Sequence, residues 1–321
     1  MKLLITGFSG FVARHFAEYL DRMQIPCEIC GIDINEPAYD YKTAFSNNLK
    51  LEYHQVNLLD TEALEGVFKS FVPDHILHLA SFSSVSYSWK HPSESFINNC
   101  VIFLNLMDMV KKFNPECRIL SVGSSEEYGN VDRQDLPLRE NQPLHPLSPY
   151  AVARVSQEQL SKIYADNYHY RIVMTRSFNH IGPRQDARFV IPSFIERILA
   201  IKNSGKDEGV IETGNVEIIR DFVDVRDVVR AYYILLTKGS PGEIYNICAG
   251  RRIALKDVIQ MIAGMTGVKI ATKVNPEYVR PQDCLEIVGT YYKMQSEFGW
   301  EPEISMETTI EDMLSSAMKS R

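Results

Sequence analysis

The sequence predicts an α/β fold with a doubly wound parallel sheet, followed by a smaller α/β portion. Three observations support this prediction. Strand-like apolar runs alternate with helical patterns through the first half of the chain. A glycine-rich turn follows the first run. After Arg176 the sequence has the composition of a loop, with Pro183 and Pro192. Alternation on this scale is typical of βαβ units, which need parallel strands with helices on both faces of the sheet.

The expected strands are the runs 2–6, 27–33, 51–56, 75–80, 118–123 and 171–176. The segment "TEALEGVFKSF" predicts a crossover helix capped by Thr61, because Leu64, Val67 and Phe68 share one face. The segments "DFVDVRDVVRAYYILL" and "EIYNICAG" predict a helix and a strand that return to the first portion. We therefore expect a discontinuous first domain of residues 1–178 and 222–247, and a second domain of residues 179–221 and 248–321.

The composition of the 321-residue chain suits one large domain or two closely joined ones. The formal charge of −7 is spread over mixed acidic and basic residues, so neither nucleic acid nor an anionic membrane is expected as a partner. The first apolar run is too short for the core of a signal peptide, and no later window approaches a membrane span. We expect a cytoplasmic protein.

Six cysteines are scattered along the chain, which favours reduced thiols over a disulfide framework. Cys27 and Cys30 form a C-x-x-C pair, but the segment "CEICGID" has the pattern of a strand and no second pair exists. Buried thiols and no metal site are therefore expected.

The segment "LLITGFSGFVARHF" combines a strand, a glycine-rich turn and a helix, with the pattern G-x-x-G-x-x-A at Gly7, Gly10 and Ala13. Glycines let the backbone approach a pyrophosphate at a helix N-terminus, where free N–H groups and the helix dipole favour negative charge. The turn predicts a Rossmann-type dinucleotide site in the first domain. Its expected cofactor contacts are Gly7, Phe8, Ser9, Gly10, Phe11 and Val12.

Asp33 ends the second strand, where its carboxylate can accept hydrogen bonds from the adenosine ribose and would repel a 2′-phosphate. We therefore expect NADH, with NADPH left open. The ends of the third and fourth strands are expected to contribute Asn57 and Leu58 beside the adenine, and Leu79, Ala80 and Ser81 beside the middle of the cofactor.

Three polar groups are candidates for chemistry: Ser124 at the end of the fifth strand, and Tyr150 and Arg154 on the helix predicted by "SPYAVARVSQEQL". Residues four apart on a helix share a face, so Tyr150 and Arg154 should point into the same cleft. A neighbouring cation favours the phenolate form of a tyrosine and makes it a better acid at neutral pH.

These motifs resemble the extended short-chain dehydrogenase/reductase family, whose members carry G-x-x-G-x-x-G, a Ser or Thr before an x-Y-G turn, and Y-x-x-x-K. The resemblance covers essentially the whole chain. The segments "SPYAVAR", "FNHIGPRQ", "RFVIP", "RDFVDVRDVVRAY", "GEIYNICAG" and "RPQD" are most similar to the branch acting on GDP-linked 4-keto-6-deoxy-mannose. The resemblance implies NAD(P)H-dependent reduction of the C4 ketone of GDP-4-dehydro-6-deoxy-D-mannose to GDP-D-rhamnose.

The resemblance also implies residue roles. Ser124 would hydrogen-bond the C4 oxygen and Tyr150 would act as its general acid, while the cation four residues on would hold the ribose hydroxyls of the nicotinamide nucleotide. The family expects lysine at that position, and this chain has Arg154. Arginine is always protonated, so it supplies charge and fork-shaped hydrogen bonds but relays protons poorly. We expect a slower reaction without loss of function.

For the substrate, a GDP-linked 4-keto-6-deoxy-hexose, the resemblance implies contacts from Asn179, Val190, Arg220 and Arg280, and from Ser83 and Ser88 near the hexose. Arginine forks suit phosphate oxygens. Phe178 is implied at the cofactor. The second domain is thus expected to bind the sugar nucleotide.

Glu126 supports a rival reaction. In the related GDP-mannose 4,6-dehydratases a Ser/Thr-x-Glu segment supplies the glutamate that moves protons during water elimination, and "SSE" matches that pattern. A 4,6-dehydratase is therefore the alternative enzyme. A non-catalytic nucleotide-binding protein on the same fold is the alternative outside catalysis.

The segment "FINNCVIFLNLMDMV" is apolar on more than one face. One side carries Ile97, Val101, Leu104, Met107 and Val110. Paired with the Tyr150 helix, the segment resembles each subunit's share of a four-helix bundle, which implies a homodimer. A wholly internal helix is the alternative.

Overall fold

The computed structural model describes residues 1–46, 48–279 and 284–319, and the chain forms two compact units. The first contains residues 1–129, 143–177 and 229–246, and the second contains residues 130–142, 178–228 and 247–321. The expected domains differ from these units at residues 130–142 and 222–228 and at the boundary residues 178 and 247, all of which belong to the second unit.

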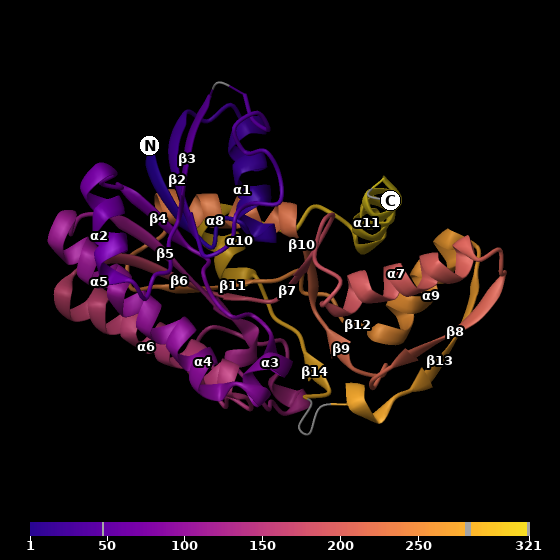
Figure 1. Cartoon of the computed structure of the whole chain (residues 1–321). Helices are drawn as coiled ribbons and strands as arrows, with labels where there is room; N and C mark the ends of the chain where they lie inside the picture. Colours follow the sequence, from indigo (N-terminus) through magenta and orange to yellow (C-terminus); the bar gives the residue numbers. More distant parts are fainter. Residues whose placement is uncertain (47, 280–283, 320–321) are drawn as a thin grey trace. The chain divides into compact units, whose positions relative to one another are not determined.

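The first unit is built on a seven-stranded sheet with the order β11-β6-β5-β4-β1-β2-β3 (Figure 1). The strands are β1 (Lys2–Thr6), β2 (Cys27–Asp33), β3 (Leu49–Gln55), β4 (His75–His78), β5 (Arg118–Ser124), β6 (Arg171–Ser177) and β11 (Ile244–Ile247). All neighbouring pairs from β6 to β3 run parallel. Strand order reverses between β1 and β4, and ligands of such sheets bind at the carboxyl ends of the strands at this switch point.

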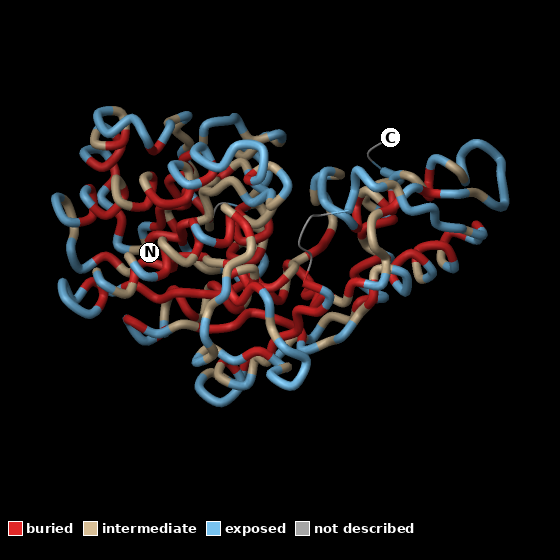
Figure 2. The backbone as a smooth tube through the Cα atoms, turned by 90° about the horizontal axis from the view of Figure 1, so that it is seen from below, coloured by how far each residue is buried: buried red, intermediate tan, exposed pale blue. Residues whose placement is uncertain are grey.

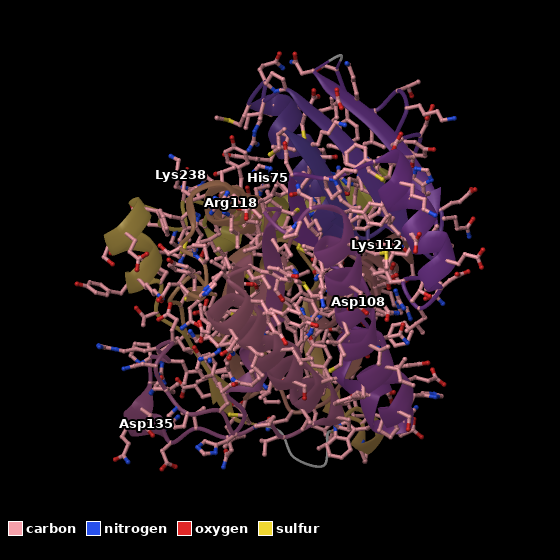
Figure 3. All side chains as sticks on the ribbon, turned by 90° about the vertical axis from the view of Figure 1, so that its left-hand side faces the viewer. His75, Asp108, Lys112, Arg118, Asp135 and Lys238 are labelled. Carbon is pink, nitrogen blue, oxygen red and sulfur yellow. The ribbon has the colours of Figure 1, made fainter. Side chains whose placement is uncertain are left out.

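Helices cover both faces of this sheet. They are α1 (Phe11–Arg22), α2 (Thr61–Ser70), α3 (Val85–Lys90), α4 (Pro92–Phe96), α5 (Ile102–Phe113), α6 (Pro149–Tyr168) and α8 (Val225–Lys238). Figure 1 shows α2, α5 and α6 on one side and α1 on the other. Figure 3 faces the first of these layers and labels Asp108 and Lys112 on α5. An ion pair of 2.8 Å between Lys112 Nζ and Glu65 Oε2 links α5 to α2.

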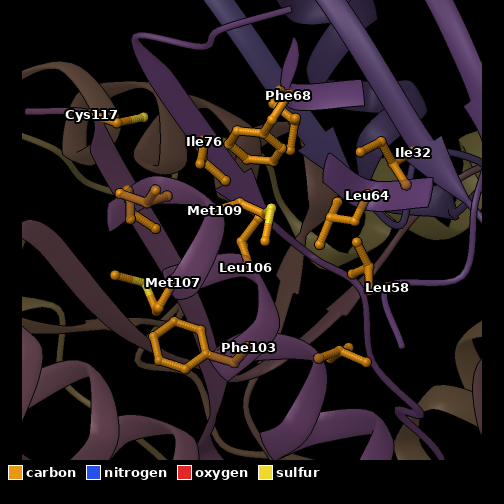
Figure 4. Close-up of a cluster of buried hydrophobic side chains, with 14 of the residues drawn as sticks. Ile32, Leu58, Leu64, Phe68, Ile76, Phe103, Leu106, Met107, Met109 and Cys117 are labelled. Carbon is orange, nitrogen blue, oxygen red and sulfur yellow. The ribbon is translucent and has the colours of Figure 1, made fainter. Parts of the chain in front are cut away.

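The main core of this unit lies between the sheet and the α2–α5 layer (Figure 4). Ile32 and Ile76 from the sheet pack with Phe68, Phe103 and Leu106 from the helices, all fully buried. Burial of one such side chain stabilises the fold by about 1.5–3 kcal/mol. Figure 2 colours the backbone by burial and shows buried segments in the interior with exposed segments around them.

The helix starts are set by side-chain caps. Asp60 caps α2 by accepting a hydrogen bond from the Ala63 N–H at 3.0 Å, so the expected cap, Thr61, is instead the first helical residue. Ser148 caps α6 in the same way, since its Oγ accepts from the Ala151 N–H at 3.1 Å. This cap puts Tyr150 in the first turn of α6.

The apolar segment 96–110 is not one regular helix. It comprises the end of α4, a π-helical turn at Ile97–Val101, and α5. Met107 and Val110 are fully buried in the core, whereas Phe96 and Ile97 are 43% and 41% exposed. The segment therefore divides its apolar residues between the core and the surface, which accounts for its apolar character on several faces.

The second unit has its own core. Its elements are β7 (Asn179–Ile181), α7 (Val190–Asn203), β8 (Glu208–Thr213), β9 (Ile219–Arg220), β10 (Phe222–Asp224), β12 (Ile253–Ala254), α9 (Leu255–Thr266), β13 (Lys269–Val274), β14 (Glu286–Ile287), α10 (Tyr292–Phe298) and α11 (Met306–Lys319). Helices α7, α9 and α11 bury Ile198, Ile262 and Ile310 completely. Within the part of the chain that the structure describes, no helix is long and apolar enough to cross a membrane.

Candidate active site

The glycine turn after β1 lies against the end of β4. Gly7 has a φ of +73°, in the left-handed region that favours glycine, and its N–H donates to Ile32 O at 2.9 Å. A Cβ on Gly7 would lie 2.9 Å from the backbone nitrogen of Ala80. Gly10 is the N-cap of α1 and has no side chain to occupy the free N–H groups of the helix. The turn is therefore a narrow cradle at an open helix N-terminus, which suits a pyrophosphate.

Asp33, at the end of β2, lies beside this turn. Its Oδ2 accepts a hydrogen bond from the Ser9 N–H at 3.1 Å, and its Oδ1 accepts one from the Asn35 N–H at 3.0 Å. Each ionised carboxylate oxygen has two lone pairs, so both oxygens can accept further bonds from ribose hydroxyls. The turn and the carboxylate thus lie together, in the arrangement that a dinucleotide needs.

Several residues expected at the cofactor use their side chains for other contacts. Phe8 is fully buried, with its ring packed where a Cβ of Gly31 would lie. Leu58 is 5% exposed and belongs to the core in Figure 4. Asn57 Oδ1 accepts from the Leu59 N–H at 2.9 Å. Phe8 and Leu58 can therefore offer only their backbone to a cofactor.

The loop after β4 and the first turn of α1 supply the other expected contacts. These residues are half-buried: Phe11, Val12, Leu79, Ala80 and Ser81. The Leu79 N–H donates to Thr6 O at 3.2 Å, and the Ala80 N–H donates to Thr6 Oγ1 at 3.2 Å. Strand β1 therefore holds this loop in position.

Ser124 is the last residue of β5 and is 9% exposed. Its Oγ accepts a hydrogen bond from the Glu126 N–H at 3.2 Å, and its own N–H donates to Glu127 Oε1 at 2.7 Å. Glu126, the residue expected to move protons, is half-buried and contacts Ser124 through its backbone. Because Ser124 Oγ is an acceptor in its bond with Glu126, its hydroxyl proton can be donated to another group.

Tyr150 and Arg154 are hydrogen-bonded to each other on α6. The Arg154 Nε–H donates to Tyr150 Oη at 3.2 Å, and the guanidinium carbon lies 5.3 Å from the centre of the phenol ring. Arg154 Nη1 donates to Val122 O at 3.0 Å and to Gln157 Oε1 at 2.8 Å. The guanidinium is 4% exposed and joins α6 to β5 two residues before Ser124.

Two neutral groups near Arg154 were not singled out by the sequence. Burial, followed by the charge of Arg154, lowers the pKa of His78 to about 3, and the His78 Nδ1 lies 2.8 Å from Thr6 Oγ1. Burial raises the pKa of Tyr232 to about 12, and its Oη lies 2.6 Å from Ser177 Oγ. His78 and Tyr232 both come from buried strand or helix segments, where sequence alone reads them as core residues.

Arg220, in the second unit, is 7% exposed, and its Nη1 donates to Ile219 O at 3.0 Å and to Cys284 O at 2.8 Å. Part of its donor capacity is therefore used by backbone carbonyls. Arg280 lies outside the described residues.

The remaining expected substrate contacts, and Phe178 that is expected at the cofactor, vary in exposure. In the second unit Asn179 is half-buried on β7, Val190 is 41% exposed at the start of α7, and Phe178 is 2% exposed. In the first unit Ser83 is exposed, whereas Ser88 is fully buried and donates to Val85 O at 2.7 Å. Ser88 is therefore a helix residue of α3 whose hydroxyl proton is already donated within the helix.

One group of potential metal ligands is formed by neighbouring strands. Single ligand atoms of Cys30, Glu52 and His54 lie within 4.8 Å of one another. Burial and the Glu52 carboxylate raise the pKa of the Cys30 thiol, which keeps it protonated. The group therefore fits a thiol that donates to a carboxylate.

The doubly wound sheet, the glycine turn at its switch point, and a tyrosine hydrogen-bonded to a cation one helical turn away define a short-chain dehydrogenase/reductase of the extended type. The chain belongs to the family described as GDP-mannose 4,6 dehydratase, whose model matches residues 4–313.

Known proteins and solved structures are similar to this chain over nearly its whole length. It is 29% identical over 314 residues to the GDP-6-deoxy-D-mannose reductase of Pseudomonas aeruginosa, covering 98% of this chain and 96% of the relative. Among solved structures it resembles RMD from Pseudomonas aeruginosa complexed with NADPH, with a TM-score of 0.83, 28% identity, and 100% and 99% of the two chains covered. It also resembles the UDP-glucose 4-epimerase of Thermus thermophilus in complex with NAD, with a TM-score of 0.85, 26% identity and full coverage of both chains.

Proposed function

We propose that this protein is an NAD(P)H-dependent oxidoreductase that reduces the C4 ketone of GDP-4-dehydro-6-deoxy-D-mannose to GDP-D-rhamnose. The observation that carries the proposal is the hydrogen bond from Arg154 Nε to Tyr150 Oη, made in the first turns of α6. It gives Tyr150 a neighbouring cation, which favours loss of the phenol proton, in a chain of the family described as GDP-mannose 4,6 dehydratase. The similarity to a GDP-6-deoxy-D-mannose reductase supports the same reaction.

The direction of this hydrogen bond determines what Tyr150 can do. A guanidinium has donors and no acceptor, so Tyr150 Oη must accept from Arg154 and its own proton points elsewhere. The adjacent positive charge stabilises the oxygen once that proton has left. Tyr150 would therefore give its proton to the ketone oxygen, while Ser124 donates a second hydrogen bond to the same oxygen.

Arg154 acts by charge and position. It stays protonated, so the proton that Tyr150 loses must return through water or a hydroxyl of the bound ligands. Its bonds to Val122 O on β5 and to Gln157 on α6 hold the guanidinium in place, which limits the movement of Tyr150. We propose that this arrangement allows reduction at a lower rate than a lysine would give.

A nicotinamide cofactor fits the first unit. The cradle at Gly7, which a Cβ would fill, and the Asp33 carboxylate beside Ser9 would hold the pyrophosphate and the adenosine ribose. When bound in reduced form, this cofactor supplies the hydride that reaches the sugar C4. Asp33 favours NADH because a 2′-phosphate would face a carboxylate, although the similar RMD structure holds NADPH.

We propose that the second unit binds the sugar nucleotide through Asn179, Val190 and Arg220. Arg280 is proposed for the diphosphate on the resemblance of its "RPQD" segment. Arg220 is buried, and hydrogen bonds from a charged group are stronger in a buried site than in bulk water. Its guanidinium therefore suits the oxygens of a phosphate.

A homodimer through a four-helix bundle is proposed for the α4–α6 layer. Val152 and Ile163 on α6 are 45% and 49% exposed and lie about three helical turns apart. Phe96 and Ile97 have similar exposed fractions, 43% and 41%. Exposed apolar side chains on one helix face favour association. Light scattering should give twice the monomer mass, and Ile163→Glu should shift the mass toward the monomer. A monomeric parent would contradict the proposal.

The alternative reaction is a 4,6-dehydration of GDP-mannose, favoured by Glu126 and by the name of the family. Two incubations distinguish the reactions: GDP-mannose with NAD(P)⁺, and its 4-keto-6-deoxy derivative with NADH or NADPH. We expect loss of reduced cofactor and a 6-deoxy sugar in the second incubation. A 4-keto product from the first incubation, without reduction in the second, would identify a dehydratase. Binding of cofactor without turnover in either would identify a non-catalytic protein.

A further inference from the structure

The turn after β5 buries a carboxyl group directly behind Ser124. Glu127 is fully buried, and its Oε1 accepts the Ser124 N–H at 2.7 Å. Ser124 Oγ in turn accepts from the Glu126 N–H, which gives a reciprocal cap of the short turn. A Cβ on Gly123 would lie 2.5 Å from Glu127 Oε1, so glycine at 123 makes room for the carboxyl. The backbone of Ser124 is thus held by Glu127.

A second buried carboxylate already has a cation. Glu158 of α6 and Arg176 of β6 are 4% and 3% exposed. They form a two-pronged ion pair, with Arg176 Nε to Glu158 Oε2 and Arg176 Nη2 to Glu158 Oε1 both at 2.8 Å. The Arg176 guanidinium also lies 4.8 Å from the centre of the Tyr128 ring. The positive charge of Arg176 is therefore matched by Glu158.

Glu127 shares the site with this pair. The charged groups that act on it are Glu158 and Arg176, so two carboxyls face one guanidinium. As a carboxylate, Glu127 has no hydrogen-bond partner for Oε2 among the described residues. Two negative charges in a buried site are strongly unfavourable, because a buried charge without a partner has lost its solvation. Burial, followed by the Glu158 charge, raises the pKa of Glu127 well above its usual range.

We propose that Glu127 is a positioning residue that stays a neutral carboxylic acid, donates its proton toward Glu158, and holds the main chain of Ser124. This leaves one positive and one negative charge in the site and gives Oε2 a donor role. The consequence for catalysis rests on the function proposed above, while the protonation state of Glu127 does not. An ionised Glu127 would be repelled by Glu158. Because the Ser124 N–H is hydrogen-bonded to Glu127, this displacement would also move the main chain of Ser124.

Infrared spectroscopy tests the protonation state directly. In D2O at pH 8 the wild-type protein should show the carbonyl band of a protonated carboxylic acid, and Glu127→Gln should lack it. Among the residues that the structure describes, Asp221 is the other buried acid with a raised pKa, about 6 because of burial, and is ionised at this pH. Glu158→Gln should also lose the band although Glu127 is intact, because Glu127 then becomes the carboxylate partner of Arg176. A wild-type spectrum without the band, or a band that survives in Glu127→Gln, would overturn the proposal.

The pH dependence of stability gives a second test. A carboxyl with a raised pKa binds its proton more tightly in the folded protein than in the unfolded chain. Wild-type stability should therefore fall, relative to Glu127→Gln, as the pH rises above the glutamate range of the unfolded chain. The ratio of the two unfolding constants should change by up to about tenfold per pH unit until Glu127 ionises. Parallel curves, or a wild type that gains stability as the pH rises, would contradict a neutral Glu127.

The positioning role has its own readout. Glu127→Leu removes the acceptor for the Ser124 N–H and should lower kcat with little change in KM. Glu127→Gln keeps an acceptor and a donor in the same places and should restore most of that kcat. A folded Glu127→Leu protein with the wild-type kcat would refute the positioning role. If the wild type reduces no 4-keto sugar at all, the proposed function fails, while the infrared and pH measurements still decide the state of Glu127.

Discussion

Replacing Arg154 by methionine keeps an apolar stem and removes the guanidinium that donates to Tyr150. That guanidinium makes hydrogen bonds to Tyr150 Oη, Val122 O and Gln157 Oε1 at 3.2, 3.0 and 2.8 Å. A hydrogen bond from a charged group is worth about 1.5–3 kcal/mol. Since about 1.4 kcal/mol is a factor of ten in rate, loss of the bond to Tyr150 should lower kcat by about 10- to 100-fold.

Arg154→Lys changes the geometry and keeps the charge. An ammonium is a point charge without the planar fork, so it cannot reproduce all three of these bonds. It can still stabilise the Tyr150 oxygen and can also relay a proton, which arginine does poorly. Arg154→Lys should therefore keep or raise kcat while the unfolding free energy falls.

The assay is the initial rate of reduced-cofactor oxidation with the 4-keto sugar nucleotide, with urea unfolding to verify that each variant is folded. Ser161→Ala is the matched control, because Ser161 Oγ bonds Ser121 Oγ at 3.0 Å between the same helix and strand. It should lose about 1 kcal/mol of unfolding free energy without loss of kcat. A wild-type kcat in Arg154→Met, or an equal loss in Ser161→Ala, would refute the role given to the cation.

Two further predictions concern the cofactor. Asp33→Ala should raise KM for NADH and reduce or reverse the preference for NADH over NADPH, and a parent that strongly prefers NADPH in steady-state kinetics would refute the ribose argument. Gly7→Ala should lose about 1–2 kcal/mol of unfolding free energy from its left-handed backbone alone, and more from the contact with the Ala80 backbone, together with most of the affinity for the dinucleotide measured by nicotinamide fluorescence. Unchanged affinity in a folded Gly7→Ala protein would show that the cradle is not the cofactor site.

The sheet and the Tyr150–Arg154 pair could be predicted because both depend on local periodicity. Alternating apolar runs require a parallel sheet, and a spacing of four residues puts two side chains on one helix face. The hydrogen bond at 3.2 Å follows from that spacing. The glycine turn between the first strand and the first helix could likewise be predicted, because its conformation depends on a short stretch of backbone.

Contacts between distant segments could not be predicted. The sequence drew attention to Glu126 through the pattern "SSE", yet Glu127 is the residue that turns inward, because Arg176 and Glu158 arrive from later elements. Leu58 follows a strand that ends near the expected adenine, but its side chain fills the core. The π-helical turn at Ile97–Val101 interrupts a segment whose composition alone predicts one helix.

Proton donation from Tyr150 to the ketone is the central step of the proposed reaction. The most direct test compares wild type and Tyr150→Phe with the GDP-linked 4-keto-6-deoxy sugar under saturating reduced cofactor. The wild type should consume one reduced cofactor for each 6-deoxy sugar formed. Tyr150→Phe, folded as judged by circular dichroism, should react slower by about 10²–10⁴-fold, the usual contribution of a positioned general acid. A phenylalanine variant that reduces the ketone at the wild-type rate would contradict the account.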